Sequence, residues 1–192
     1  MPALPTATGT NTMSNSFLGE NIQICVVTRD FRRTMEGLTR TGIGPWRVYT
    51  FSPETVQNMT YRGKPARYSM KLGLAWSGAM NWEIVQPLAG PNIYEEFLQA
   101  HGEGIHHVAF GCNAMPYAER IRAFESRGYE MIQSGLWLGQ VPYHYFDTEG
   151  DTTTTFEIFQ APDGYEFPEP EEWYPAPPPK AWSRPCSSDS LL

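Results

Sequence analysis

The alternation of apolar and polar residues predicts a β-α-β-β-β order of elements in the first half of the chain. A segment rich in β-branched residues, 22–27, is expected to be a strand, and Asp30 is expected to cap an amphipathic helix that ends near Arg40. Farther along, the pattern predicts three strands and a connecting helix, at 46–51, 66–76, 81–86 and 92–100. The polar stretch 52–64 is expected to be a loop or an irregular hairpin arm.

The same order of elements recurs in the second half. The pattern there predicts a strand, a helix and three further strands, at 107–110, 115–127, 129–134, 141–147 and 153–160. The last strands of the two halves read Trp-Glu-Ile-Val-Gln at 82–86 and Phe-Glu-Ile-Phe-Gln at 156–160. This match indicates an internal duplication and predicts one α+β domain over 20–162, built from two βαβββ modules at 20–100 and 101–162.

Composition narrows the class of protein. The chain has 192 residues, a formal net charge of −7 and no clustered basic stripe, which argues against nucleic-acid binding. No stretch is long and apolar enough to cross a bilayer, so no membrane contact is expected. The three cysteines, at 25, 112 and 186, form no closely spaced pair, which indicates a reducing compartment. The expected location is therefore the cytoplasm.

The two ends of the chain differ in composition from the middle. Residues 1–19 carry no secretory signal and are expected to be a disordered leader. Residues 163–192 are rich in proline and acidic side chains at first and in serine at the end, and are expected to form a tail without a regular element. Within that tail, Trp173 and Tyr174 are the side chains expected to anchor an extended strap across the domain.

Two of the four histidines stand together in Gly-Glu-Gly-Ile-His-His-Val-Ala-Phe at 102–110. Because side chains alternate along a strand, His106 and His107 are expected to point to opposite faces, with His107 toward the cavity. A lone histidine on such a face is more often a structural imidazole than a metal ligand. Partners elsewhere in the chain must decide between these interpretations.

The duplication supplies three such partners. Gln23 stands where the first module would place the equivalent of His107, and the last strand of each module carries one glutamate, Glu83 and Glu157. Each glutamate lies between bulky apolar neighbours, so its carboxylate should project to the opposite face. Two such carboxylates would repel each other, and a divalent cation would remove that repulsion. Alternatively, each glutamate faces water on a half-exposed strand.

A set of oxygen and nitrogen ligands suits a hard or borderline divalent ion such as Mg, Mn, Fe, Co, Ni or Zn, and does not single one out. Cys25 shares a face with Gln23, so its side chain could approach the site, although a small buried apolar filler is its expected role.

These residues resemble the vicinal oxygen chelate superfamily, and most closely its glyoxalase and methylmalonyl-CoA epimerase branch. The likeness rests on the motif at 102–110, on Glu-Ile-Val-Gln-Pro at 83–87 and on Gly-Ile-Gly-Pro-Trp at 42–46. It implies an open mixed β-barrel around one divalent metal ion. By position, the ligands implied are Gln23, Glu83, His107 and Glu157, with Gln23 standing where the epimerase branch usually has histidine.

The resemblance implies a metal-dependent isomerase, epimerase or lyase. Its substrate would be a small molecule that chelates the ion through carbonyl or hydroxyl oxygens, with an aromatic or polyketide-like compound favoured by the aromatic content, and would react through an enolate-type intermediate. A protein base must then move a proton. The candidates are His144, Lys71, Tyr143, Tyr145 and Glu54. Of these, His144 has the most suitable ordinary pKa.

Two other functions remain open at this point. An extradiol-type dioxygenase usually needs two histidines and one carboxylate around iron, whereas one histidine is placed to serve here. A non-catalytic binding protein of the bleomycin-resistance kind is the other alternative. The expected partners are a small molecule and, in a homodimer, a second copy of the chain.

Overall fold

The computed structural model describes residues 17–111 and 115–179. The elements of the first module are β1 (Asn21–Val27), α1 (Phe31–Arg40), β2 (Trp46–Phe51), β3 (Val56–Tyr61), β4 (Lys64–Pro65), β5 (Ser69–Ser77), β6 (Met80–Ala89) and α2 (Ile93–Ala100). Those that follow are β7 (Gly104–Phe110), α3 (Tyr117–Glu125), β8 (Met131–Trp137), β9 (Val141–Phe146), α4 (Glu149–Thr152), β10 (Thr155–Phe159) and β11 (Glu172–Tyr174). The α+β class is confirmed.

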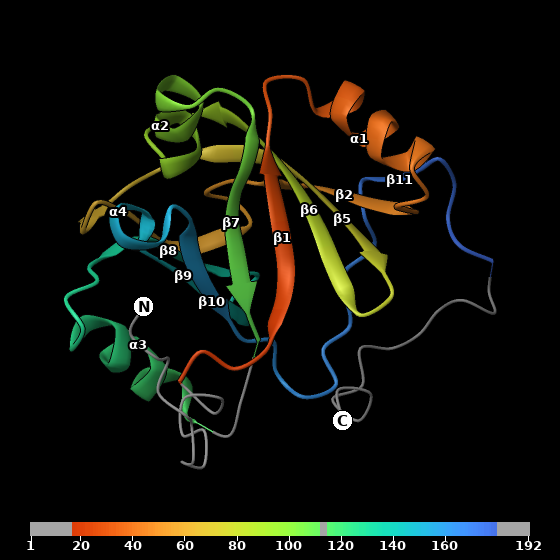
Figure 1. Cartoon of the computed structure of the whole chain (residues 1–192). Helices are drawn as coiled ribbons and strands as arrows, with labels where there is room; N and C mark the ends of the chain where they lie inside the picture. The colour runs from red at the N-terminus through yellow and green to blue at the C-terminus, as the bar shows by residue number, and fades with distance from the viewer. Residues whose placement is uncertain (1–16, 112–114, 180–192) are drawn as a thin grey trace, which may run out of the picture.

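The strands form one curled mixed sheet in the order β11-β2-β5-β6-β1-β7-β10-β9-β8-β3-β4. The first strands of the two modules, β1 and β7, pair antiparallel at its centre and join the modules, as Figure 1 shows. Each first strand also pairs in parallel with the last strand of its own module, β1 with β6 and β7 with β10. The first and last strands of both modules therefore lie side by side, in the order β6-β1-β7-β10.

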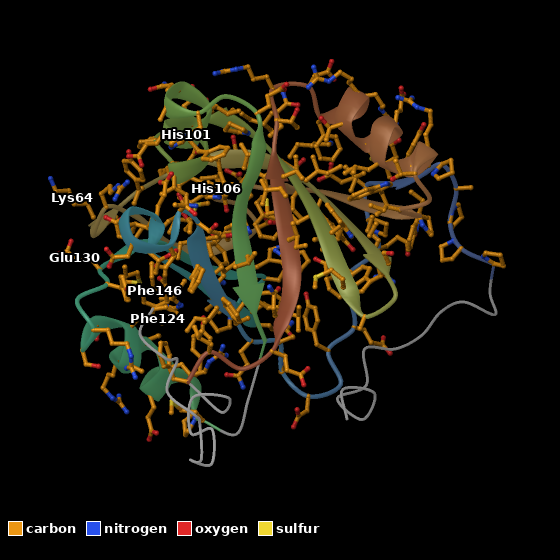
Figure 2. The ribbon with its side chains drawn as sticks, viewed as in Figure 1. Lys64, His101, His106, Phe124, Glu130 and Phe146 are labelled. Carbon is orange, nitrogen blue, oxygen red and sulfur yellow. The ribbon has the colours of Figure 1, made fainter. Side chains whose placement is uncertain are left out.

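Helices α1 and α3 each cover the outer face of one half of the sheet (Figure 1). Asp30 caps α1 by accepting a hydrogen bond from the backbone of Arg33, and Phe31 and Met35 of this helix are buried. On the other half, Phe124 of α3 stacks on Phe146 of β9 with ring centroids 3.9 Å apart (Figure 2). Burial of these apolar faces is the main force that holds the helices on the sheet.

The inner face of the curled sheet has its own buried cluster, which we call the interior cluster. It joins side chains of β1, β2, β3, β5, β6, β8 and β9 with α2, and its members include Cys25, Leu72, Tyr94, Tyr143 and Tyr145. Because α2 contributes to it directly, this helix covers an open part of the half-barrel rather than its outer surface.

Of the two alternatives for 52–64, the structure supports the hairpin arm, because β3 pairs antiparallel with β4, and it corrects the loop. Residues Val56–Tyr61 form strand β3, which pairs antiparallel with β8 at the edge of the second module. The register of that pairing shifts between Gln57 and Thr60. The shift breaks the two-residue apolar period by which a strand is recognised in a sequence.

The C-terminal segment is also more ordered than the sequence predicted. Strand β11, which contains Trp173 and Tyr174, pairs antiparallel with β2, so the expectation of a tail without regular elements is wrong for this part. Before it, Tyr165 and Phe167 pack against the interior cluster. We call 161–174 the strap. The predicted disordered leader falls mainly on 1–16, outside the described residues, whereas Phe17 packs edge-on against Phe124.

Within the described residues, no helix has the length and apolar character needed to cross a membrane.

Candidate functional site

The four side chains expected to bind a metal come from the four central strands. Cys25 of β1 lies opposite Glu83 of β6 on one side and opposite His107 of β7 on the other. Gln23 precedes Cys25 by two residues on β1 and therefore faces the same side of the sheet. It lies opposite Ala109 of β7, and Ala109 lies opposite Glu157 of β10. Strand pairing thus places all of these residues on two neighbouring rungs of the sheet.

Their polar atoms meet at the imidazole of His107. Its Nε2 atom lies 3.1 Å from Oε2 of Glu83 and 3.2 Å from Oε2 of Glu157. Gln23 donates a hydrogen bond from Nε2 to the same oxygen of Glu157 at 3.5 Å. All four side chains are buried, and His107 has no exposed surface. The structure brings the four residues together, and their role as ligands stays a prediction.

The ionisable groups of this cluster shift one another's pKa values. Burial would lower the pKa of His107, but the carboxylates of Glu157 and Glu83 raise it to about 9. Burial raises the pKa of Glu157, against the effect of His107. If both carboxylates are ionised, even a protonated imidazole leaves one negative charge in excess. Within the described part of the chain, Nε2 of His107 and Oε2 of Glu83 have no partner with hydrogen-bond geometry, despite their proximity.

This donor set fits a divalent cation. Two carboxylates and one imidazole are common ligands of borderline and hard ions, and a cation would supply the positive charge that the cluster lacks. Unpartnered polar atoms are costly when buried, so the two that point into the cluster indicate a missing partner. Cys25 completes a group with Glu83 and His107 whose ligand atoms all lie within 4.8 Å of one another.

The two adjacent histidines do not point to opposite faces, which corrects the sequence-based expectation. The pairing of β1 with β7 shifts its register between Cys25 and Val26, which lie opposite His107 and Ile105. His106 is therefore the extra residue of a β-bulge, and a bulge redirects the side chain that it carries.

As a result, the two imidazoles contact each other. Their Nδ1 atoms lie 2.9 Å apart, so one donates a hydrogen bond and the other accepts it. His106 is buried beside the rings of Tyr94 and Phe97 of α2, and Figure 2 shows it beneath this helix. This contact orients His107 with Nε2 toward the carboxylates, as a hydrogen-bonded neighbour does for many ligating histidines.

Four buried tyrosines surround the cluster on the inner face. Tyr94 donates a hydrogen bond to the hydroxyl of Tyr145 at 2.8 Å, and the hydroxyls of Tyr68 and Tyr143 lie 3.0 Å apart. The hydroxyl of Tyr145 near Glu157 opposes the rise that burial causes in the pKa of that carboxyl. Burial raises the pKa of all four hydroxyls. They therefore stay protonated at neutral pH and serve as hydrogen-bond donors rather than as bases.

Three of the five base candidates lie away from this cluster. His144 faces the α3 side of β9, where its Nδ1 atom contacts the hydroxyl of Tyr117 at 2.8 Å, and burial lowers its pKa to about 4. Lys71 forms an ion pair with Glu171 of the strap at 3.0 Å. Glu54 is exposed and hydrogen-bonds Ser52. Of the five candidates, Tyr143 and Tyr145 share the interior cluster with the predicted ligands.

From the sequence alone, Tyr68, Tyr94 and the bridging place of Cys25 were not assigned to the site. Tyr68 immediately precedes β5, and Tyr94 belongs to a helix whose inward face the apolar pattern alone does not define. In the sequence, only the two-residue spacing of Cys25 from Gln23 indicated that its thiol faces the same side of the strand. Burial, together with the carboxylate of Glu83, raises the pKa of this thiol.

Comparison with known proteins identifies the family. Residues 22–144 match the model of the Glyoxalase/Bleomycin resistance protein/Dioxygenase superfamily, and this range is more than half of the chain. The chain belongs to this superfamily. It is also 26% identical over 81 residues to YqjC of Bacillus subtilis, an uncharacterized protein. That match covers 41% of this chain and 56% of the relative, so it spans little more than half of that protein's length.

Solved structures share the fold at low sequence identity. Methylmalonyl-CoA epimerase from Mycobacterium tuberculosis superposes with a TM-score of 0.59 at 12% identity, over 79% of this chain and 94% of that one. Hypothetical protein BH1468 from Bacillus halodurans gives a TM-score of 0.55 at 16% identity, over 77% of this chain and 98% of that one. At such identities the likeness establishes the curled-sheet fold.

Proposed function

We propose that the chain is a divalent-metal-dependent isomerase, epimerase or lyase for small molecules that offer two neighbouring oxygens. The observation that carries this proposal is the buried convergence of two carboxylates on one imidazole, with Nε2 of His107 3.1 and 3.2 Å from Glu83 and Glu157. These three side chains would hold the ion. Gln23 would join them through its carbonyl oxygen after its amide group rotates by half a turn.

A divalent ion bound there supplies Lewis-acid stabilisation of negative charge that develops on a substrate oxygen. The chain itself provides hydrogen-bond donors and proton acceptors. The hydroxyls of Tyr143 and Tyr145 are protonated and face the interior, so they can donate to a substrate oxygen. Glu83 and Glu157 are the carboxylates that are buried among the described residues, and one of them is the proposed proton acceptor.

This proposal replaces His144 and Lys71 as candidate bases. Both side chains have partners on the outer side of the sheet, and neither reaches the interior cluster. The fold shared with methylmalonyl-CoA epimerases supports proton transfer at a carbon next to a carbonyl group, although the substrate of those proteins is not thereby assigned to this chain.

Isotope exchange tests the reaction type. Purified protein in deuterated water is given a panel of enolisable compounds, namely α-hydroxy ketones, β-dicarbonyl compounds and methylmalonyl-CoA, and deuterium incorporation is followed by NMR. Wild type should exchange the proton next to the carbonyl of at least one compound, without dioxygen. Glu83→Ala and Glu157→Ala should lose this exchange, whereas Glu130→Ala, which removes an exposed carboxylate, should retain it.

The alternatives give different results in the same experiment. Turnover that stops without dioxygen and returns only with ferrous iron would contradict the proposal in favour of a dioxygenase. Tight binding of a compound by wild type with no exchange in the whole panel would favour a binding protein.

A further inference from the structure

We infer that the thiol sulfur of Cys25 is an additional ligand of the proposed ion, so that the site selects a borderline ion such as Zn²⁺, Co²⁺ or Fe²⁺ over Mg²⁺. The inference rests on the metal site of the proposed function and extends it to the choice of metal.

The position of Cys25 on the sheet carries the first part of the argument. It is the β1 residue that lies directly between Glu83 and His107 on the same rung, and it has no exposed surface. Its sulfur and the ligand atoms of those two residues lie within 4.8 Å of one another. Tetrahedral bonds of zinc to sulfur and to nitrogen or oxygen, about 2.3 and 2.0–2.2 Å long, place ligand atoms roughly 3.3–3.8 Å apart, so small side-chain movements would bring the three atoms onto one ion.

The two unpartnered atoms form the second, independent observation. Oε2 of Glu83 and Nε2 of His107 are buried and have no partner with hydrogen-bond geometry among the described residues. They belong to the two side chains that flank Cys25 on its rung. A cation bound between them would therefore contact the sulfur as well.

The duplication allows a comparison within the chain. In the antiparallel pairing of β1 with β7, Gln23 lies opposite Ala109 and Cys25 lies opposite His107. When the two modules are superposed, Gln23 is therefore equivalent to His107, and Cys25 is equivalent to Ala109. The partners agree with this mapping, because Cys25 lies beside Glu83 as Ala109 lies beside Glu157. If the position required only a small buried filler, alanine would serve in the first module as it does in the second.

The mapping also shows what the sulfur adds. At the first pair of equivalent positions, the second module has the imidazole of His107 and the first has the amide of Gln23. At the second pair, the first module has the thiol of Cys25 and the second has the methyl group of Ala109. Each module thus provides one nitrogen or sulfur donor and one carboxylate. A set with thiolate and imidazole favours Zn²⁺, Co²⁺ or Fe²⁺, whereas Mg²⁺ prefers oxygen alone. On coordination the sulfur binds as thiolate and its proton leaves to solvent.

Cobalt absorption tests the inference directly. The full chain is titrated with Co²⁺, and thiolate-to-cobalt charge transfer is recorded in the near ultraviolet while bound cobalt is counted by elemental analysis. Wild type should bind one cobalt with this band. Cys25→Ala should lose the band and bind cobalt at least about tenfold more weakly, with a smaller change for Mn²⁺. The double variant Cys112→Ser/Cys186→Ser should keep both the band and the affinity.

Each remaining outcome has a definite meaning. One cobalt bound to wild type without the band would overturn the role of Cys25 and leave the other ligands in place. Absence of cobalt binding at any concentration would overturn the proposed metal site as well. Cys25→Ala reproduces the residue of the other module, so it should fold, and Cys25→Ser provides a second variant that must also lose the band.

Discussion

At the scale of single residues, the imidazole of His107 sets the electrostatics of the interior. It is a buried group that can carry positive charge, and it contacts both Glu83 and Glu157. With both carboxylates ionised, a second positive charge is needed for neutrality, and burial makes that need stronger than it would be in water. The same reasoning explains why His106, buried against α2 without a carboxylate, has a pKa well below its usual value.

His144 gives a pH-dependent prediction of its own. Burial lowers its pKa to about 4, from about 6.5 when unfolded. The unfolded chain therefore takes up a proton that the folded chain refuses, so the stability from neutral His144 is complete above pH 6.5 and declines as the pH falls toward 4. Between pH 7 and 5, wild type should lose about 2 kcal/mol more free energy of unfolding than His144→Gln.

Urea denaturation at a series of pH values measures this difference. Glutamine keeps a polar group that can face Tyr117 but does not titrate, so the difference between the two curves isolates the imidazole. Parallel curves for wild type and His144→Gln would show that His144 takes up its proton equally well in the folded state.

The sequence predicted which residues meet in the cluster but not how His106 is placed. Strand parity and duplication were enough to select Gln23, Glu83, His107 and Glu157, because both depend on the regular period of a strand. The bulge at His106 adds one residue to that period, and nothing in the local sequence marks it. The sequence shows that His144 and Phe146 share one face of β9, because they are two residues apart. It does not show which face α3 covers, because that depends on tertiary packing.

At the scale of elements, α2 and the strap cover the interior cluster from two sides. Tyr94 of α2 contacts both histidines of β7. In the strap, Phe167 contacts the rings of Trp76 and Trp137, and the hydroxyl of Tyr49 donates a hydrogen bond to the carbonyl of Pro168 at 2.9 Å. The strap therefore completes the core of the half-barrel rather than trailing from it.

A substitution in the strap tests this role. Phe167→Ala should lower the free energy of unfolding, because it removes the ring that contacts both Trp76 and Trp137. The loss should be below the roughly 3–5 kcal/mol of a fully buried phenylalanine, since Phe167 is half-buried. Glu166→Ala, an exposed neighbour, is the control for urea denaturation. Equal stability of the two variants would show that the strap contributes little to the core.

The elements that the sequence missed share one physical reason. Strands β3 and β11 each form at an outer part of the sheet by pairing with a distant partner, β8 and β2. Their own residues carry weak apolar alternation, so pairing rather than local preference defines them. The central strands, whose apolar pattern is strong, were predicted, and their observed ends differ from the predicted ones by a few residues.

At the scale of the whole molecule, the duplication determines where the candidate site lies. Pairing of β1 with β7 places the first strands of both modules at the centre, and their last strands flank them on either side. Each module alone supplies part of the cluster, Gln23, Cys25 and Glu83 from one and His107 and Glu157 from the other. The proposed ligand set therefore requires both modules to be folded and joined, and ion binding at it should stabilise the domain as a unit.

Chelation provides the last prediction. With free ion at about 100 times its dissociation constant, binding adds about 2.7 kcal/mol to the stability, which is a rise in Tm of roughly 5–10 °C for a chain of this length. A strong chelator should lower the Tm of wild type and of Glu130→Ala by this amount and release one equivalent of metal. Glu157→Ala should hold no metal and show no response. Because this variant also removes one of two repelling carboxylates, it should unfold at or above the Tm of metal-free wild type. A lower Tm would mean that Glu157 stabilises the fold without an ion, through Gln23, Tyr145 and His107.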